Sequence, residues 1–410
     1  MSDASSQDAV FVARQPIWDR YQRVIGYELL YRSGYDNRNT ALDGDRATTE
    51  VLINSTLGVG LDRLVGHQPA YFNVTASFIR GDHALPLDQD RTVLEILEDI
   101  EPDEDVLRGI EAWRSKGFTI ALDDFQYSDI VAPLLELADI VKIEVLGRDP
   151  DQLRQQVQRL QQYNVELLAE KVETHEEFQT CQELGFERFQ GFFFCKPHVV
   201  QGHRVASNRL VILNLIAQLQ DPNVELPELQ SLIIQDVTLT YRLLRYINSP
   251  AFGMTRPVET VNRALALIGA DRIRDWASLL LMTRIDDKPP ELMRIALIRG
   301  RMGFLLSDQL SNSGSPDQSF TAGLLSVLDA LMDRPMAEIT EELPLTQSVQ
   351  EALVSRQGPL GETLAATIAY EQGLWGSPSL ELLSISELSG AYLNALEWAD
   401  STMQSLGTVD

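Results

Sequence analysis

The feature that most constrains the fold is a change of hydrophobic pattern near residue 200. From residue 11 to about 196, short apolar runs alternate with longer amphipathic segments. Alternation of this kind is typical of strands and helices in βαβ units around a parallel sheet. From about residue 205 onward, apolar residues recur with the spacing of amphipathic helices. The 410-residue chain is therefore predicted to form two domains, at residues 1–204 and 205–410.

The N-terminal half contains eight candidate strands, each rich in Val, Ile, Phe or Leu. They are Phe11–Trp18, Val24–Tyr31, Ala70–Val74, Thr92–Leu97, Thr119–Phe125, Ile140–Val145, Val165–Val172 and Arg188–Phe194. Predicted helices between them include Ala47–Leu57, Asp103–Lys116, Ser128–Leu137, Pro150–Tyr163 and His175–Leu184. The first two strands are joined by a linker too short for a crossover, which indicates an antiparallel hairpin. We expect an α/β domain, a compact (β/α)8 TIM-like barrel with an antiparallel first strand.

The C-terminal half is predicted to be all-α. Helical periodicity begins at Arg209–Ile216 and continues through further segments separated by polar loops. Those segments are Pro227–Ile234, Leu239–Ile247, Val258–Ile268, Asp271–Met282, Pro290–Leu310, Ser319–Met332, Ser348–Ser355 and Leu360–Glu371.

Charge and cysteine content exclude several classes of protein. With 34 Lys and Arg against 60 Asp and Glu, the formal net charge is −26. Binding to DNA or RNA polymers or to an anionic membrane surface is therefore not expected. The two cysteines cannot supply a disulfide framework, the N-terminus is polar, and no apolar run approaches the ~18 residues of a membrane span. We expect a cytoplasmic protein.

Polar side chains mark the C-terminal end of nearly every predicted strand, where barrels carry their catalytic groups. These residues are Glu28 with Arg32, Asn73, Glu95, Asp123 with Asp124, Lys142 with Glu144, Glu170 with Glu173, and Gln190. One such carboxylate would indicate a buried ion pair. Several carboxylates at one barrel mouth would repel each other strongly unless cations lie among them. Oxygen ligands favour Mg²⁺ or Mn²⁺, and two such ions together promote attack of water on a phosphodiester.

Seven short motifs in this half resemble, in the same order, those of EAL-domain cyclic-di-GMP phosphodiesterases. Glu28-Leu29-Leu30-Tyr31-Arg32 resembles the Glu-Ala-Leu-x-Arg signature of that family. The others are Asn73, Glu95-Ile96-Leu97-Glu98, Asp123-Asp124-Phe125, Lys142-Ile143-Glu144, Ala169-Glu170-Lys171-Val172-Glu173 and Gln190-Gly191-Phe192. Each motif alone is weak evidence of a resemblance to this family, whereas seven motifs in the same order are specific to it.

The resemblance implies a role for each of these residues. Two metal ions, Mg²⁺ or Mn²⁺, would be held by a set of Asn and acidic ligands. That set is Glu28, Asn73, Glu95, Asp123, Asp124, Glu144 and Glu173. Glu170 would be the general base for the attacking water, and Lys142 would orient that water or stabilise charge on the phosphate. Arg32 and Gln190 would bind the ligand, cyclic-di-GMP, and Glu98 would support the metal ligands from behind.

Three residues depart from the family pattern. Gln126 replaces the Gly after Asp-Asp-Phe, in a loop that contributes to dimerisation in the family. Glu144 replaces an Asp, and Lys171 replaces a Gly beside the implied base. A shift of about 1 Å in such a site can reduce the rate about 10²-fold. Hydrolysis of cyclic-di-GMP and a degenerate barrel that only binds a nucleotide or a partner therefore both remain open, as does a homodimer.

The C-terminal half resembles the HDOD domain, an HD-related helical fold. The resemblance lies in the stretches 236–249, 263–269 and 323–328. All five His residues precede the first predicted helix of this half, which argues against a histidine-based metal site there. The order of a YuxH-like EAL barrel followed by HDOD resembles bacterial signal-transduction proteins, and it implies protein partners for the helical half.

A different chemistry is possible for the barrel, because barrels also host Schiff-base aldolases. Lys142 would then be the nucleophile. The surrounding carboxylates argue against this alternative, because they would keep the lysine protonated.

Overall fold

The computed structural model describes residues 11–32, 60–81, 87–196, 207–221, 223–235, 237–248, 258, 260–283, 285, 288–307, 315–381 and 383–406. The chain forms two compact units. The barrel unit comprises Met1–Phe194 with Glu371–Gly376, and the helical unit comprises Cys195–Tyr370 with Ser377–Asp410. Each is described separately below.

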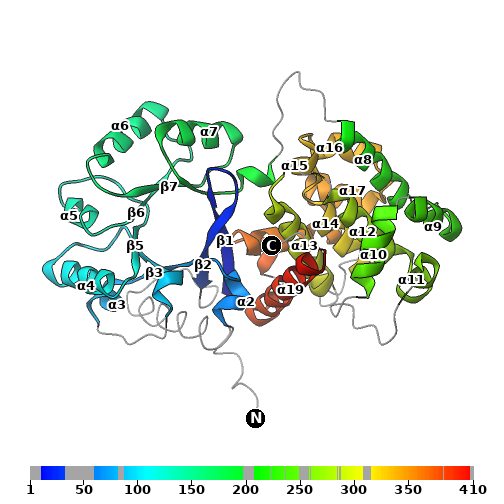
Figure 1. Cartoon of the computed structure of the whole chain (residues 1–410), viewed down its shortest axis with the longest axis horizontal. Helices are drawn as coiled ribbons and strands as arrows, with labels where there is room; N and C mark the ends of the chain where they lie inside the picture. Colours follow the sequence, from blue (N-terminus) through cyan, green and yellow to red (C-terminus); the bar gives the residue numbers. More distant parts are fainter. Residues whose placement is uncertain are drawn as a thin grey trace, which may run out of the picture. The chain divides into compact units, whose positions relative to one another are not determined.

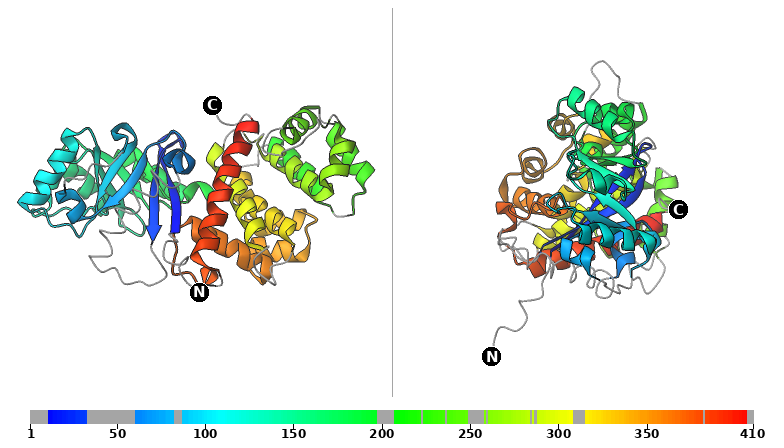
Figure 2. Two further views of the ribbon diagram at one scale, coloured as in Figure 1. Left: turned by 90° about the horizontal axis from the view of Figure 1, so that it is seen from below. Right: turned by 90° about the vertical axis from the view of Figure 1, so that its left-hand side faces the viewer.

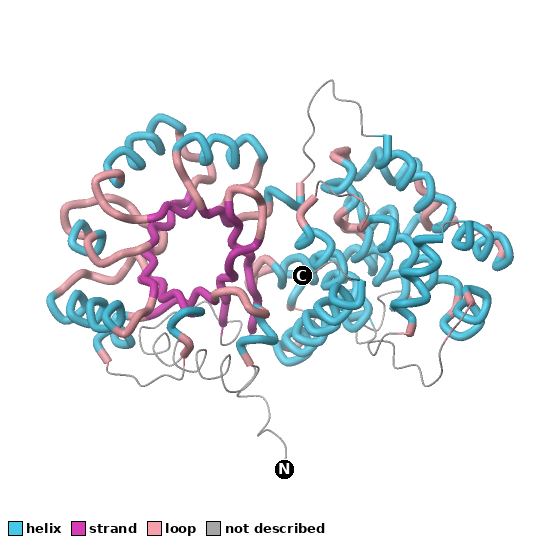
Figure 3. Tube along the Cα trace, in the orientation of Figure 1, coloured by secondary structure: helices cyan, strands magenta, loops and turns pink. Residues whose placement is uncertain are grey.

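The barrel unit contains a closed barrel of eight strands, which confirms the predicted fold class (Figures 1 and 3). The strands are β1 (Phe11–Asp19), β2 (Val24–Arg32), β3 (Ala70–Val74), β4 (Thr92–Ile96), β5 (Thr119–Leu122), β6 (Ile140–Glu144), β7 (Glu166–Glu170) and β8 (Arg188–Gln190). β1 is antiparallel to both β2 and β8, and every other neighbouring pair is parallel. The hairpin β1–β2 arises because the four-residue turn between them leaves no room for a crossover.

Helices lie outside the ring of strands (Figure 3). They are α2 (Leu61–Val65), α3 (Ala76–Arg80), α4 (Glu104–Ser115), α5 (Ala132–Leu135), α6 (Pro150–Leu160) and α7 (His175–Leu184). The side chains of Asp103, Asp149 and Thr174 cap α4, α6 and α7 by accepting hydrogen bonds from main-chain N–H groups. The predicted helix over Ala47–Leu57 lies outside the described residues.

The interior of the barrel is apolar in one layer and polar in the next. Ile17, Tyr71, Val93, Ala121, Ile140 and Leu168 form a buried apolar cluster. Because side chains alternate along a strand, the residue two positions later also points inward, nearer the C-terminal mouth. For β3 to β7 these later residues are Asn73, Glu95, Asp123, Lys142 and Glu170, of which Asp123 directly follows the end of β5. The strand register thus places the predicted site residues above a solid apolar floor.

The helical unit contains only helices among its described residues, which confirms the predicted all-α half. They are α8 (Ser207–Gln220), α9 (Leu226–Gln235), α10 (Val237–Ile247), α11 (Val261–Ile268), α12 (Ala270–Met282), α13 (Pro290–Ser307), α14 (Pro316–Leu325), α15 (Leu328–Met332), α16 (Met336–Glu342), α17 (Gln347–Ser355), α18 (Gly358–Glu371) and α19 (Ile385–Leu406). The single helix predicted over Ser319–Met332 is divided at Val327. Helices α16 and α19 have no counterpart among the sequence-based predictions.

Helix α13, most of whose residues are buried, packs against α14 and α19 (Figure 2). Gly323 allows α14 to pack close to α13. A Cβ atom there would lie 2.5 Å from main-chain atoms of Arg299 and Gly300 on α13, so a larger residue would push the helices apart. In the described residues of both units, no helix is both long and apolar enough to cross a membrane.

Candidate functional site

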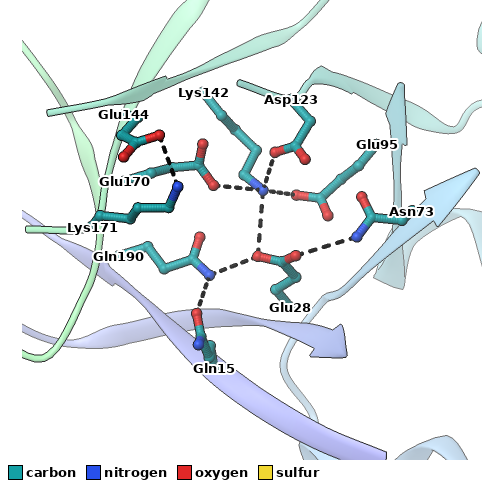
Figure 4. A network of polar contacts seen from close by, with 10 residues as sticks. All are labelled: Gln15, Glu28, Asn73, Glu95, Asp123, Lys142, Glu144, Glu170, Lys171 and Gln190. Carbon is teal, nitrogen blue, oxygen red and sulfur yellow. Dashed lines mark hydrogen bonds and ion pairs between the residues drawn. The ribbon is translucent and has the colours of Figure 1, made fainter. Parts of the chain in front are cut away.

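Most of the polar residues at the barrel mouth form one connected network, which Figure 4 shows together with a separate ion pair of Glu144 and Lys171. At its centre is the ammonium group of Lys142, which is fully buried. Its Nζ atom lies 2.6 Å from Asp123 Oδ1, 2.7 Å from Glu95 Oε1, 2.9 Å from Glu170 Oε1 and 3.3 Å from Glu28 Oε2. One lysine therefore faces four carboxylates, which come from β2, β4, the residue directly after β5, and β7. The structure brings these five predicted residues together.

The side-chain amides of two residues also donate hydrogen bonds to Glu28. Its Oε2 accepts a 2.6 Å hydrogen bond from Gln190 Nε2, and its Oε1 accepts a 3.4 Å bond from Asn73 Nδ2. Gln190 also donates to Gln15 Oε1 at 2.9 Å. Gln15, which the sequence analysis did not single out, is the residue of β1 that pairs with Glu28 of β2. Gln15 could have been identified from the sequence as a polar residue within the otherwise apolar run of β1.

Glycine is required next to Gln190. Gly191 has φ +149°, and a Cβ atom there would lie 2.0 Å from the carbonyl oxygen of Val172. The same carbonyl accepts a hydrogen bond from Phe193, and Val172 donates to the carbonyl of Gln190. This close contact fixes the chain just after Gln190, so the amide is presented to Glu28 from a rigid position.

The charges in this network shift one another's pKa values. Burial alone would lower the pKa of Lys142, but the four carboxylates outweigh it and raise that pKa well above its ordinary value. Burial, and then the charge of Glu28, raises the pKa of Glu95 well above the usual range of a carboxyl group. Burial likewise raises the pKa of Glu170, to about 7, although Lys142 opposes the shift. A single ammonium therefore does not compensate all the buried negative charge.

Several oxygen atoms of the site have no hydrogen-bond donor among the described residues. They are Asn73 Oδ1, both carboxylate oxygens of Glu95, Asp123 Oδ1 and Glu170 Oε2. Two of them, Glu95 Oε1 and Asp123 Oδ1, form ion pairs with Lys142 Nζ at 2.7 and 2.6 Å. Buried oxygens without donors are costly, and a hard divalent cation would satisfy them. The donor chemistry at the mouth thus fits Mg²⁺ or Mn²⁺.

Two of the three departures from the family pattern contact each other. Lys171 Nζ lies 2.8 Å from Glu144 Oε2 (Figure 4). The backbone of Lys171 has φ +54°, and that of Asp124 has φ +40°, so both are in the left-handed region that favours glycine. The pKa of Asp124 is raised by burial and partly restored by the charge of Lys171. Lys171 therefore places a positive charge beside the predicted ligands Asp124 and Glu144.

The remaining predicted residues lie around this network. Glu173 is in the turn between β7 and α7, where its N–H donates to Glu177 at 2.8 Å. Glu98 is exposed after β4 and borders a cavity of about 290 Å³ that Asp123, Asp124 and Gln126 also line. Arg32 ends β2, but its side chain lies outside the described residues. The roles given to all these residues stay predictions.

Comparison with known proteins gives matches for both units. The EAL domain family matches residues 66–197, which excludes Glu28, and the HDOD domain family matches residues 207–366. Uncharacterized protein YuxH of Bacillus subtilis is 32% identical over 408 residues, which cover 97% of this chain and 99% of YuxH. Cyclic di-GMP phosphodiesterase CdgJ of Vibrio cholerae is 32% identical over 369 residues, which cover 89% of this chain and 85% of CdgJ.

Solved structures with an EAL domain also resemble the chain. One is the Bacillus subtilis YkuI protein in complex with substrate c-di-GMP and calcium. It is 18% identical, the match covers 65% of this chain and 76% of YkuI, and the TM-score is 0.37.

Proposed function

Because this chain belongs to the EAL cyclic-di-GMP phosphodiesterase family and carries an HDOD domain, we propose that its barrel hydrolyses cyclic-di-GMP with two Mg²⁺ or Mn²⁺ ions. The observation that carries the proposal is the 32% identity to CdgJ, a cyclic di-GMP phosphodiesterase, over most of both chains. The buried, donor-less oxygens at the barrel mouth support it, because they suit divalent cations.

The residues of the mouth divide into distinct roles under this proposal. Glu28, Asn73, Glu95, Asp123, Asp124, Glu144 and Glu173 are the set from which the metal ligands come. The bound ions would supply Lewis acidity toward the phosphodiester and its attacking water. Arg32 and Gln190 would hold the cyclic dinucleotide, and Glu98 would support the ligands.

The proton transfer is assigned to Glu170. Its raised pKa, about 7, matches that of a base working near neutral pH. Glu170 would accept the proton of the attacking water as the water oxygen bonds to phosphorus and the bond from phosphorus to the leaving ribose oxygen breaks. The leaving oxygen would take a proton from solvent and become a hydroxyl group. The product is the linear dinucleotide. Lys142 would orient the water and stabilise the phosphate charge, since its raised pKa keeps it positive. The same raised pKa disfavours the Schiff-base alternative.

A second function, binding without turnover, is favoured by one specific observation. Lys142 occupies the point where the four carboxylates converge. Within the described residues, no group of three or more His, Cys, Asp or Glu side chains is arranged as it stands to hold a metal ion. A barrel in which Lys142 permanently takes the place of a metal would sense a nucleotide or serve as a scaffold. The HDOD domain would bind protein partners in either case.

One assay separates the two functions. The full chain is incubated with cyclic-di-GMP and Mn²⁺ or Mg²⁺, and the linear dinucleotide is measured by chromatography. We expect product from the wild type, none after Glu28→Ala, and unchanged turnover after Glu111→Ala, which removes an exposed carboxylate of α4. Absence of product from the wild type would refute the hydrolase. Saturable binding of cyclic-di-GMP in that case would support the sensor function. Absence of binding would leave the scaffold function as the remaining alternative.

A further inference from the structure

The helical unit contains an aromatic cavity of about 250 Å³, which the proposed function does not use. Five aromatic rings line it, each from a different helix: Tyr246, Trp276, Phe304, Phe320 and Trp398. The rings of Tyr246 and Trp276 are 3.9 Å apart between centroids, and those of Phe320 and Trp398 are 5.8 Å apart. Phe304, Phe320 and Trp398 are only half-buried, so the aromatic wall extends to solvent. Such a wall suits a flat ring.

Two arginines add positive charge to the same cavity. The guanidinium groups of Arg272 and Arg301 lie 5.9 and 5.5 Å from the ring centroid of Phe304. Arg272 is 3.7 Å from Asp317, and both side chains are about half-exposed. Arg301 donates to Asn394 Oδ1 at 3.1 Å and has no carboxylate within ion-pair distance in the described part of the chain. Burial, and then the charge of Arg272, lowers the pKa of Arg301. An anion would relieve this repulsion.

The acidic residues of the cavity do not cancel this charge. Asp275 is buried in its wall, and the hydroxyl of Thr321 lies 2.9 Å from its carboxyl group. Burial raises the pKa of Asp275 to about 8, so the group is mostly uncharged at pH 7. Two guanidinium groups therefore face the carboxylate of Asp317 and a mostly uncharged Asp275.

We propose that this cavity binds a nucleoside monophosphate, with its base stacked on the aromatic wall and its phosphate on Arg301 and Arg272. The aromatic rings and guanidinium groups match the two parts of such a ligand, since arginine forks suit phosphate oxygens. The volume of about 250 Å³ lies just below the usual range of ligand pockets, roughly 300–1,000 Å³, which favours a mononucleotide over a dinucleotide. This site lies within the helical unit and does not depend on the activity of the barrel.

Calorimetric titration of the full chain with GMP, AMP or UMP, without divalent metal, tests the proposal. We expect saturable binding of at least one nucleotide. Guanosine, which lacks the phosphate, and inorganic phosphate, which lacks the base, should each bind about tenfold more weakly or worse. Absence of binding of all three nucleotides at about millimolar concentration overturns the proposal. Because no metal is added, a failure here is independent of phosphodiesterase activity.

Substitutions of the cavity residues test whether the nucleotide binds there. Arg301→Gln and Trp398→Leu should each weaken nucleotide binding about tenfold or more, whereas Arg263→Gln, an exposed control on α11, should leave it unchanged. Circular dichroism establishes that each variant is folded. If Arg301→Gln fails to fold, the exposed Arg272→Gln replaces it, with the same expected loss. Wild-type affinity in a folded arginine variant would mean that the nucleotide binds elsewhere and would overturn the proposal.

Discussion

The barrel mouth and the aromatic cavity both gather charged groups, but they leave opposite charges in excess. At the mouth, four carboxylates surround the single ammonium of Lys142. In the cavity, two guanidinium groups face Asp317 and a mostly neutral Asp275. The first arrangement favours added cations and the second favours an added anion. The comparison teaches that the sign of the uncompensated charge, more than the number of polar residues, indicates which ligand a buried site accepts.

The largest expected effect is on the rate of hydrolysis, and it tests whether a carboxylate at the mouth takes part in catalysis. Glu170→Gln keeps the shape of the side chain but removes the proton acceptor, so turnover of cyclic-di-GMP should fall about 10²–10⁴-fold. Chromatographic measurement of the linear product gives the rate, and titration with cyclic-di-GMP should show that binding is retained. Glu111→Gln is the matched control. An unchanged rate in Glu170→Gln would exclude this carboxylate as the base.

The next largest effect is on the stability of the protein, which depends on the balance of charge at the mouth. Lys142→Met leaves four carboxylates, three of them buried, without their cation and should lower the free energy of unfolding by about 3–5 kcal/mol. Urea denaturation in a chelator measures this loss, and Mg²⁺ or Mn²⁺ should restore part of it. Lys116→Met, at an exposed lysine, should cost less than about 1 kcal/mol. Equal stability of the two variants would contradict the importance of the central ammonium.

Sequence patterns predicted the mouth far better than the cavity, for a physical reason. In a closed barrel, the order of the strands fixes where their ends meet, so a polar residue two positions after a core residue must point into the mouth. Asn73 and Glu95 could be placed on this basis alone. The position of Lys142 among all four carboxylates could not, because it depends on the reach of a long side chain. Gln15 was missed because it lies outside every motif.

The cavity depends on contacts between helices that the sequence does not specify. Helix α19 carries Trp398 and was not predicted, and neither Trp398 nor Arg301 belongs to a recognisable motif. Amphipathic periodicity gives the buried face of a helix but not its partner, so rings from five helices could not be brought together from spacing. The charge excess of the cavity appears only when the packing is known.

Asp275 gives a pH-dependent test of the cavity's charge. Its folded pKa, about 8, lies above the unfolded value of 3.8, so between these values the unfolded chain loses the proton that the folded chain keeps. Asp275 therefore makes the free energy of unfolding fall as pH rises through this window. Asp275→Asn removes the contribution. The stability of the variant relative to wild type should rise by about 1.4 kcal/mol per unit from pH 5 to 7, measured by urea denaturation. A pH-independent difference would mean that Asp275 is not held neutral.

The smallest effect concerns Lys171, the one cation beside the mouth that departs from the family pattern. Lys171→Gly removes a positive charge near Asp124 and Glu144, so the affinity for Mn²⁺ should rise about threefold to tenfold by calorimetry. Stability should change by less than about 1 kcal/mol, because relief of the left-handed backbone offsets the greater freedom of the unfolded chain, and the half-exposed ion pair contributes little.

Lys171→Ala separates charge from backbone strain in the same position. It also removes the ammonium but keeps a Cβ atom at φ +54°, so it should show the same gain in Mn²⁺ affinity with about 1 kcal/mol less stability than Lys171→Gly. A gain in affinity with glycine alone would mean that backbone relaxation, and not the charge, controls the cation site. If neither variant gains affinity, Lys171 does not contribute to the charge balance of the mouth, and the carboxylates there are compensated by Lys142 alone.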